Sequence, residues 1–275
     1  MPRLSIMEEE NDEKINVLPG KIISNVNALL VSEVLSNLYN GYSFFFGAVF
    51  PIFLMVMISK GALGDVPASL KPELVTSLLI SMSMIIPLST MFLGYAATYS
   101  NELEKDVPTR LSLFGFSGTR LFMGKLIANY IFLTFCFALY LVGTLSFVKI
   151  AKPAAPAVII WVISIYLMSA LCLALAHGIA NLIRRFSITY GVAMAIYFTI
   201  MALGGMMGVS LKDQPLEMQT VSRLFPFTYF GNGYIDFWMG REYNFAPYIQ
   251  SLIFFAAVSI GVMMISFKVR GRKDN

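Results

Sequence analysis

The sequence predicts an all-α membrane protein in which six apolar helices cross the bilayer. Of its 275 residues, 57% are hydrophobic and 13% are charged, whereas a soluble domain has about 25% charged residues. Six apolar stretches reach the roughly 20 residues that a helix needs to cross a hydrocarbon core about 30 Å thick. Lipid is therefore the expected solvent for most of the chain.

None of the six predicted spans contains Asp, Glu, Lys or Arg, so each inserts at little cost. They are Tyr42–Ser59, Leu74–Tyr99, Leu126–Phe147, Pro156–Ala176, Phe186–Met207 and Tyr248–Phe267. The second span is the longest and contains Pro87, where we expect a tilt or a kink. The six-span domain, 42–267, lies between a cytoplasmic N-terminal segment, 1–41, and a basic cytoplasmic tail, 268–275.

The distribution of Lys and Arg predicts the orientation. With the N-terminus inside, the inner segments hold 13 of the 20 basic residues and the outer loops hold 7. The positive-inside rule then places both termini in the cytoplasm. The seven outer residues are Lys60, Lys71, Lys149, Lys152, Lys212, Arg223 and Arg241.

An amphipathic helix is predicted over residues 21–40, where apolar residues recur at steps of three and four. The apolar positions are Ile23, Val26, Leu30, Val34 and Leu38, and other faces carry polar residues such as Glu33 and Asn37. Such a helix fits an elbow along the cytoplasmic interface, or a helix packed on the protein's own cytoplasmic face. The acidic stretch 8–13 before it is unlike the basic flank of a signal peptide.

The cytoplasmic connection between the second and third spans carries the signals of a short helix. Asp106 fits an N-cap, and Pro108 is tolerated in a first helical turn. Leu111 and Phe114 are three residues apart and therefore share a face, before Gly115 stops the turn. We expect a short helix across the inner face of the membrane, and a solvated linker is the alternative.

Residues of this connection resemble the corresponding loop of type-2 ABC exporter permeases. The matching positions are Glu104, Lys105, Asp106, Thr109, Leu111 and Leu113, then Gly124, Lys125 and Leu126. In that family an acidic-basic cluster leads into a short coupling helix, and a Gly-Lys pair opens the third span. The run at 224–229 is similar to the family's segment before the last span. Pro108 stands where a Gly is common and no Pro follows Phe114, which leaves the register of the coupling helix open.

The resemblance implies the permease subunit of an ATP-driven exporter. A separate ATPase subunit would bind the coupling helix, with Leu111 and Phe114 as apolar contacts. The surrounding charged residues would be Glu102, Glu104, Lys105, Asp106 and Arg110. The chain has no G-x-x-x-x-G-K-[ST] loop, so ATP and Mg²⁺ would be held by the partner, and this chain would bind no cofactor. A second permease copy, identical or not, and a cell-membrane location are also implied.

The sequence says less about the substrate path than about the contact with the ATPase. Ser77, Ser81 and Thr90 belong to a second span rich in hydroxyl groups, and Ser77 and Ser81 share one face. These hydroxyls either line a path or bond to their own helix backbone or a neighbour. The substrate itself stays open.

The loop between the fifth and sixth spans contains an apolar stretch that is too short to cross the membrane. Pro226, Phe227 and Tyr229 belong to it. We expect a re-entrant or surface segment on the outer side.

Other functions fit the sequence less well. Gly115-Phe116-Ser117-Gly118 matches G-x-S-G and, with His177, would suit a rhomboid-like intramembrane serine protease, but Ser117 lies in a charged connection. An ion-coupled transporter usually needs ionisable groups near the midplane. A single His argues against a metal enzyme, and scattered basic residues argue against nucleic-acid binding. A membrane scaffold without transport is a further alternative, because docking and coupling helices look alike.

Overall fold

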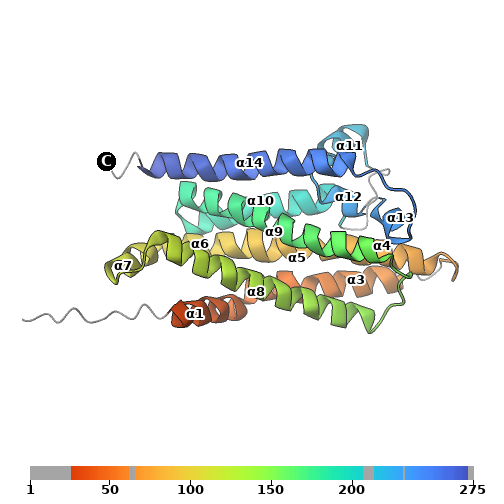
Figure 1. Ribbon diagram of the computed structural model, residues 1–275, viewed down its shortest axis with the longest axis horizontal. Helices are drawn as coiled ribbons and strands as arrows, with labels where there is room; N and C mark the ends of the chain where they lie inside the picture. Colours follow the sequence, from red (N-terminus) through yellow and green to blue (C-terminus); the bar gives the residue numbers. More distant parts are fainter. Residues whose placement is uncertain (1–25, 62, 64–65, 207–213, 232, 272–275) are drawn as a thin grey trace, which may run out of the picture.

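The computed structural model describes residues 26–61, 63, 66–206, 214–231 and 233–271, which form an elongated bundle of helices without strands (Figure 1). Six of these helices are long and apolar enough to cross a membrane, which confirms the predicted fold class. They are Gly41–Gly61, Lys71–Glu104, Gly118–Leu145, Ala155–Ile183, Phe186–Leu203 and Ala246–Val269. The acidic stretch 8–13, the start of the predicted amphipathic helix and residues 272–275 of the predicted tail lie outside the described residues.

The helices carry the labels of Figure 1. α1 (Val26–Tyr39) precedes the first span, which consists of α2 (Gly41–Phe44), the π-helix η1 (Phe45–Val49) and α3 (Phe50–Gly61). The second span consists of α4 (Lys71–Ser83), α5 (Ile85–Pro87), the π-helix η2 (Leu88–Gly94) and α6 (Tyr95–Glu104). Then follow α7 (Val107–Leu113), α8 (Gly118–Leu145), α9 (Ala155–Ile183) and α10 (Phe186–Leu203). Three short helices, α11 (Leu216–Ser222), α12 (Thr228–Gly231) and α13 (Tyr234–Trp238), precede α14 (Ala246–Gly271).

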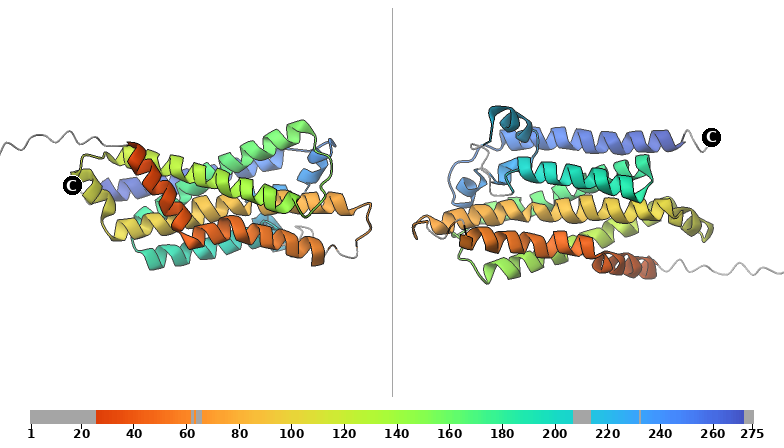
Figure 2. Two further views of the ribbon diagram at one scale, coloured as in Figure 1. Left: turned by 90° about the horizontal axis from the view of Figure 1, so that it is seen from below. Right: turned by 180° about the vertical axis from the view of Figure 1, so that it is seen from behind.

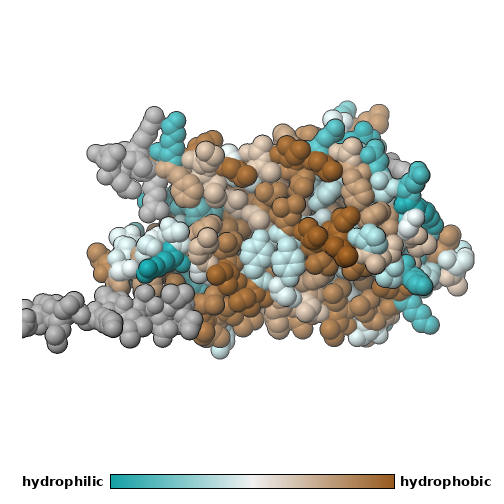
Figure 3. Space-filling model, in the orientation of Figure 1, coloured by the Kyte–Doolittle hydropathy of each residue, from teal (hydrophilic) through white to brown (hydrophobic). Residues whose placement is uncertain are grey.

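The bundle has two distinct ends. α1, α7 and the last turns of α14 lie at one end, and α11, α12 and α13 lie at the other (Figures 1 and 2). We call these the α7 end and the α12 end. Hydrophobic side chains cover much of the visible face between them, and hydrophilic ones gather toward the ends (Figure 3). A bilayer requires this distribution, because charged side chains are costly in hydrocarbon.

The second span is the centre of the bundle. In the apolar 18-residue stretch that marks it as a span, 83% of the second span is buried, whereas the corresponding stretches of the other five spans are between 17% and 50% buried. Its 34 residues correspond to about 50 Å of helix, well beyond a hydrocarbon core of about 30 Å. The helix extends past both predicted ends, Leu74 and Tyr99. Past Tyr99, Glu102 and Glu104 are accommodated because Lys125 and the Phe186 N–H donate hydrogen bonds to them.

The first and second spans pack together through their π-helical segments. A Cβ atom added at Gly47 would lie 2.7 Å from Thr90 Cγ2, and one added at Gly94 would overlap Ser43. η2 begins directly after Pro87. Proline has no N–H to donate, so the regular hydrogen-bond ladder is interrupted there, where the sequence predicts a kink. π-helical turns recur at functional sites of other proteins.

The packing of α9 along α14 depends on a glycine. A Cβ atom added at Gly178 would lie 2.8 Å from the backbone nitrogen of Met263 and 2.9 Å from the backbone carbon of Val262. Backbone atoms cannot rotate away as a side chain can. The two helices therefore approach this closely only because residue 178 has no side chain.

We predict that Gly178→Ala lowers the thermal stability of the detergent-solubilised protein. Overpacking of this kind costs about 1–3 kcal/mol. Gly191→Ala in α10 is the matched control, since its added Cβ would meet nothing within 4 Å and alanine favours a helix. A thermal unfolding scan should show a lower midpoint for Gly178→Ala and an equal or higher one for Gly191→Ala. Equal midpoints would contradict the close α9–α14 contact.

Candidate functional site

α7 is present where the sequence predicts a short helix. Asp106 is its N-cap residue, but in a left-handed conformation (φ 53°) and without a side-chain capping hydrogen bond. Pro108 falls in the first turn, as predicted. The turn after the helix contains Gly115 (φ 86°), a conformation that glycine adopts without steric cost.

The apolar residues of α7 divide between an inner and an outer surface. Pro108 and Leu111 line a cavity, whereas Leu113 is 81% exposed and Phe114 is 62% exposed. The spacing in the sequence pairs Leu111 with Phe114. The structure instead exposes Leu113 next to Phe114, because the helix ends there and Phe114 leaves the helical conformation.

A buried ion cluster joins three helices at the α7 end. Lys125 Nζ donates to Glu33 Oε1 at 2.7 Å and to Glu102 Oε1 at 2.6 Å. The side chains of Lys125, Glu33 and Glu102 are 8%, 15% and 20% exposed. They come from α8, α1 and α6. Because an unpaired buried charge is very costly, this cluster fixes the three helices relative to one another.

The other charged residues of the connection differ in their surroundings. Glu104 Oε2 accepts a hydrogen bond of 2.7 Å from the first backbone N–H of α10, where the helix dipole favours a carboxylate. Lys105, Asp106 and Arg110 are exposed. Of the five charged residues predicted to surround the apolar contacts, Glu102 and Glu104 therefore bond within the bundle, and the other three face outward.

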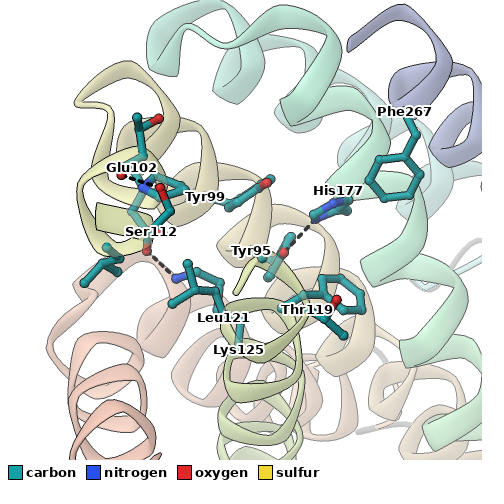
Figure 4. A pocket seen from close by; sticks show the side chains of 14 residues that line it. Tyr95, Tyr99, Glu102, Ser112, Thr119, Leu121, Lys125, His177 and Phe267 are labelled. Atoms are coloured by element: carbon teal, nitrogen blue, oxygen red, sulfur yellow. Dashed lines mark hydrogen bonds and ion pairs between the residues drawn. The ribbon is translucent and has the colours of Figure 1, made fainter. Parts of the chain in front are cut away.

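A cavity of about 600 Å³ lies between α7 and the ends of α6, α8, α9 and α14 (Figure 4). His177 Nδ1 lies 2.9 Å from the Tyr95 hydroxyl, and the His177 ring stacks on Tyr99 with ring centroids 4.7 Å apart. Phe122 and Phe267 also line it, with Glu102 and Lys125. Since α7 borders this space, it can shift on that side without displacing close-packed side chains.

The local pattern of the sequence does not reveal the partners of Lys125. The periodicity sets Glu33 and Asn37 apart from the apolar stripe of α1. In the structure Glu33 pairs with Lys125, and Asn37 is 5% exposed, while the apolar Val31 and Leu35 are 57% and 43% exposed. α1 packs against α8 and crosses it at an angle (Figure 2). The sequence offered one signal for this pairing. Glu33 and Lys125 carry opposite charges, each lies beside apolar residues, and burying either charge without a partner would be costly.

The hydroxyl groups that the sequence offers as path residues lie in the crowded second span. Thr90 Oγ1 donates to the carbonyl oxygen of Ile86 in its own helix at 2.8 Å. Ser81 is buried against Gly231 of α12, and Ser77 is half-buried. Thr90 therefore bonds to its own helix backbone, the commoner role of such a hydroxyl.

The predicted outer segment packs into the α12 end. Pro226 and Phe227 are buried, and the half-buried Tyr229 donates its hydroxyl to the carbonyl oxygen of Arg223 at 3.0 Å. α12 contacts α4, the first helix of the central span. The segment therefore packs against the bundle, and its place relative to the membrane stays a prediction.

Ser117 and His177, the pair considered for a protease, have other structural roles. Ser117 is the N-cap of α8 and its hydroxyl accepts from the Arg120 N–H at 3.4 Å. His177 Nδ1 pairs with the Tyr95 hydroxyl. In the part of the chain that the structure describes, no group of three or more His, Cys, Asp or Glu side chains is placed to hold a metal ion.

We predict that Ser117→Ala destabilises the protein slightly and that Ser117→Asp does not. Loss of an N-cap costs about 1 kcal/mol, and Asp caps as well as Ser. Thermal unfolding of the two variants measures this difference. Aspartate retains the cap but cannot replace a serine nucleophile. If the protein has a proteolytic activity and both variants lose it, that result would support the protease alternative.

We predict that Lys125→Met destabilises the protein far more than Lys105→Met, the exposed control. Removing one partner of a buried ion pair leaves uncompensated charge and costs roughly 3–5 kcal/mol, whereas an exposed charge contributes little. Thermal unfolding in detergent should show a much lower midpoint for Lys125→Met alone. Similar midpoints for the two variants would mean that the cluster does not hold the α7 end together.

The comparisons with known proteins agree with this architecture. The family model described as ABC-2 family transporter protein matches residues 5–268, a range that includes the first five spans, all but the last residue of the sixth, α7 and the Lys125 cluster. A search of curated proteins gave no match. The family model covers nearly the whole chain, and its members are membrane components of transporters. The chain therefore belongs to the ABC-2 transporter family, as a type-2 ABC permease.

Proposed function

We propose that the protein is the permease subunit of an ATP-driven exporter and that a separate ABC ATPase subunit drives it through α7. The observation that carries this proposal is the exposed apolar tip of α7, Leu113 and Phe114, attached to the end of the buried central span. A solvent-exposed Phe and Leu side by side fit the apolar anchor of a protein contact. Membership of a permease family makes an ATPase the expected partner.

The charges around this tip fit the rim of such a contact. Lys105, Asp106 and Arg110 are exposed on and beside α7. Rim charges contribute chiefly to the rate of encounter and to orientation, while the apolar anchor contributes most of the affinity. In this proposal Leu113 and Phe114 enter a pocket of the ATPase, and the three charged residues set the angle of docking.

Movement of α7 would reach the spans along three routes. α7 continues from α6, the end of the central span. Lys125 ties α6 to α8 and α1, and Glu104 ties α6 to the first turn of α10. The cavity beside α7 supplies the space for displacement. The π-helical segment η2, which packs against η1 of the first span, is the interruption at which the central span can bend.

ATP hydrolysis would supply the free energy for transport, and differential binding by the ATPase would transmit it to the permease. A partner that contacts both permease conformations equally well shifts nothing. ATP-driven closure must therefore favour one position of α7 over the other. ATP and Mg²⁺ would be bound by the ATPase, in a complex with two permease copies and with the α7 end and both termini in the cytoplasm.

We predict that an ABC ATPase copurifies with the wild-type protein from its native membranes and is lost with Leu113→Asp/Phe114→Asp. Two carboxylates would be desolvated without partners in the docked complex. Leu216→Asp/Met218→Asp is the matched control, because these α11 side chains are 80% and 51% exposed at the opposite end. The control should retain the ATPase. An ATPase absent from the wild-type sample, or retained by the α7 variant, would contradict the proposal.

A further inference from the structure

A second cavity, of about 410 Å³, lies at the α12 end and gathers three lysines. Lys60 is in the last turn of α3, Lys71 is the first residue of α4, and Lys149 follows α8. Lys60 and Lys71 flank the connection between α3 and α4, and Lys149 lies in the connection between α8 and α9. All three line one hollow. Its other walls include the buried Val75 and the exposed Phe147, and Lys60 Nζ lies 5.7 Å from the centroid of the Phe147 ring.

These lysines are not neutralised by carboxylates within the described residues. The ion pairs found there are those of Lys125 and of Arg241, and none involves Lys60, Lys71 or Lys149. Arg241, a cation at the same end, has Glu73 Oε1 and Asp236 Oδ1 each at 2.9 Å, and these hydrogen bonds raise its pKa. Among the described residues, the three lysines thus place positive charge without an ion-pair partner around one cavity.

Three lysines that are merely solvated would not be expected in this arrangement. A cation in the last turn of a helix is favourable, which accounts for Lys60, but Lys71 stands in a first turn, where the helix dipole disfavours a cation. Like charges around a shared hollow also repel one another. An anion bound between them would remove both penalties.

The position of the lysines indicates where that anion lies. Lys60 is next to the end of the first span, Lys71 begins the second, and Lys149 comes four residues after the end of the third. This is the level at which hydrocarbon gives way to headgroups. Below it, α3 exposes Phe53 and Met57, as a surface in contact with acyl chains does.

We propose that this cavity binds the phosphate of an anionic phospholipid headgroup, with Lys60, Lys71 and Lys149 around the phosphate and Val75 and Phe147 against the glycerol and upper acyl carbons. Lysine ammonium groups bind phosphate as point charges. Basic pockets between transmembrane helices on the cytoplasmic side bind anionic headgroups, and the same chemistry would operate at the α12 end. The site requires only that the chain spans a membrane, so it is independent of the ATPase partner.

The test uses the full-length protein in neutral detergent and follows its unfolding temperature as ligand is added. The ligands are short-chain phosphatidylglycerol, short-chain phosphatidylcholine and inorganic phosphate, each titrated separately. The variant is Lys60→Gln/Lys149→Gln. The control is Lys152→Gln/Arg223→Gln, which removes two exposed positive charges of the same end without touching the cavity. All four residues are exposed, so both variants should fold.

We expect phosphatidylglycerol to stabilise the wild type, and its apparent affinity to fall about 10- to 30-fold in Lys60→Gln/Lys149→Gln. In the control variant the apparent affinity should change by about twofold or less, since exposed charges that do not line the cavity are screened by salt and contribute little. Equal stabilisation by phosphatidylcholine, or equal losses in both variants, would overturn the site. Inorganic phosphate as effective as the lipid would overturn the headgroup assignment in favour of a free anion.

Discussion

The α7 end of the structure depends on the neutralisation of one buried ammonium group. Lys125 lies inside the third span, where its charge is tolerated only because Glu33 and Glu102 accept hydrogen bonds from it. This requirement brings α1 onto α8 and fixes the end of α6 beside them. It also places Lys125 and Glu102 in the wall of the cavity that borders α7. A single ion cluster thereby connects the N-terminal helix, the central span and the short helix at its tip.

The central span connects the two ends of the molecule. At the α7 end it continues into α7, and at the α12 end α12 and α13 pack against α4. Because its middle part, residues 79–97, is buried throughout, this part cannot move without repacking its neighbours. The interruption at Pro87 and η2, opposite η1, is therefore the natural place for a conformational change to concentrate. In the proposed transport cycle, the ATPase acts at one end of this helix and the outer segment responds at the other.

Local patterns in the sequence predict local structure well here. Apolar length predicts six spans, and Asp106, Pro108 and Gly115 predict α7. The ion cluster escapes such analysis because Glu33 and Lys125 are 92 residues apart, and no helical period relates them. Periodicity likewise cannot tell that Leu111 faces a cavity while Leu113 faces outward, since that depends on how α7 leans on α6 and α8. Charges at the margins of apolar segments were the available signal, and their pairing needed the tertiary structure.

The most direct test of the central claim measures whether the cluster holds α1 and α7 in a fixed relation. Spin labels would be placed at Ser36 of α1 and Thr109 of α7, both exposed, after replacing the buried Cys136 and Cys172 by alanine. Pulsed electron paramagnetic resonance then compares this protein with the same protein carrying Lys125→Met. We predict a narrow distance distribution that broadens or shifts when Lys125 is lost. A narrow, unchanged distribution in the variant would contradict it.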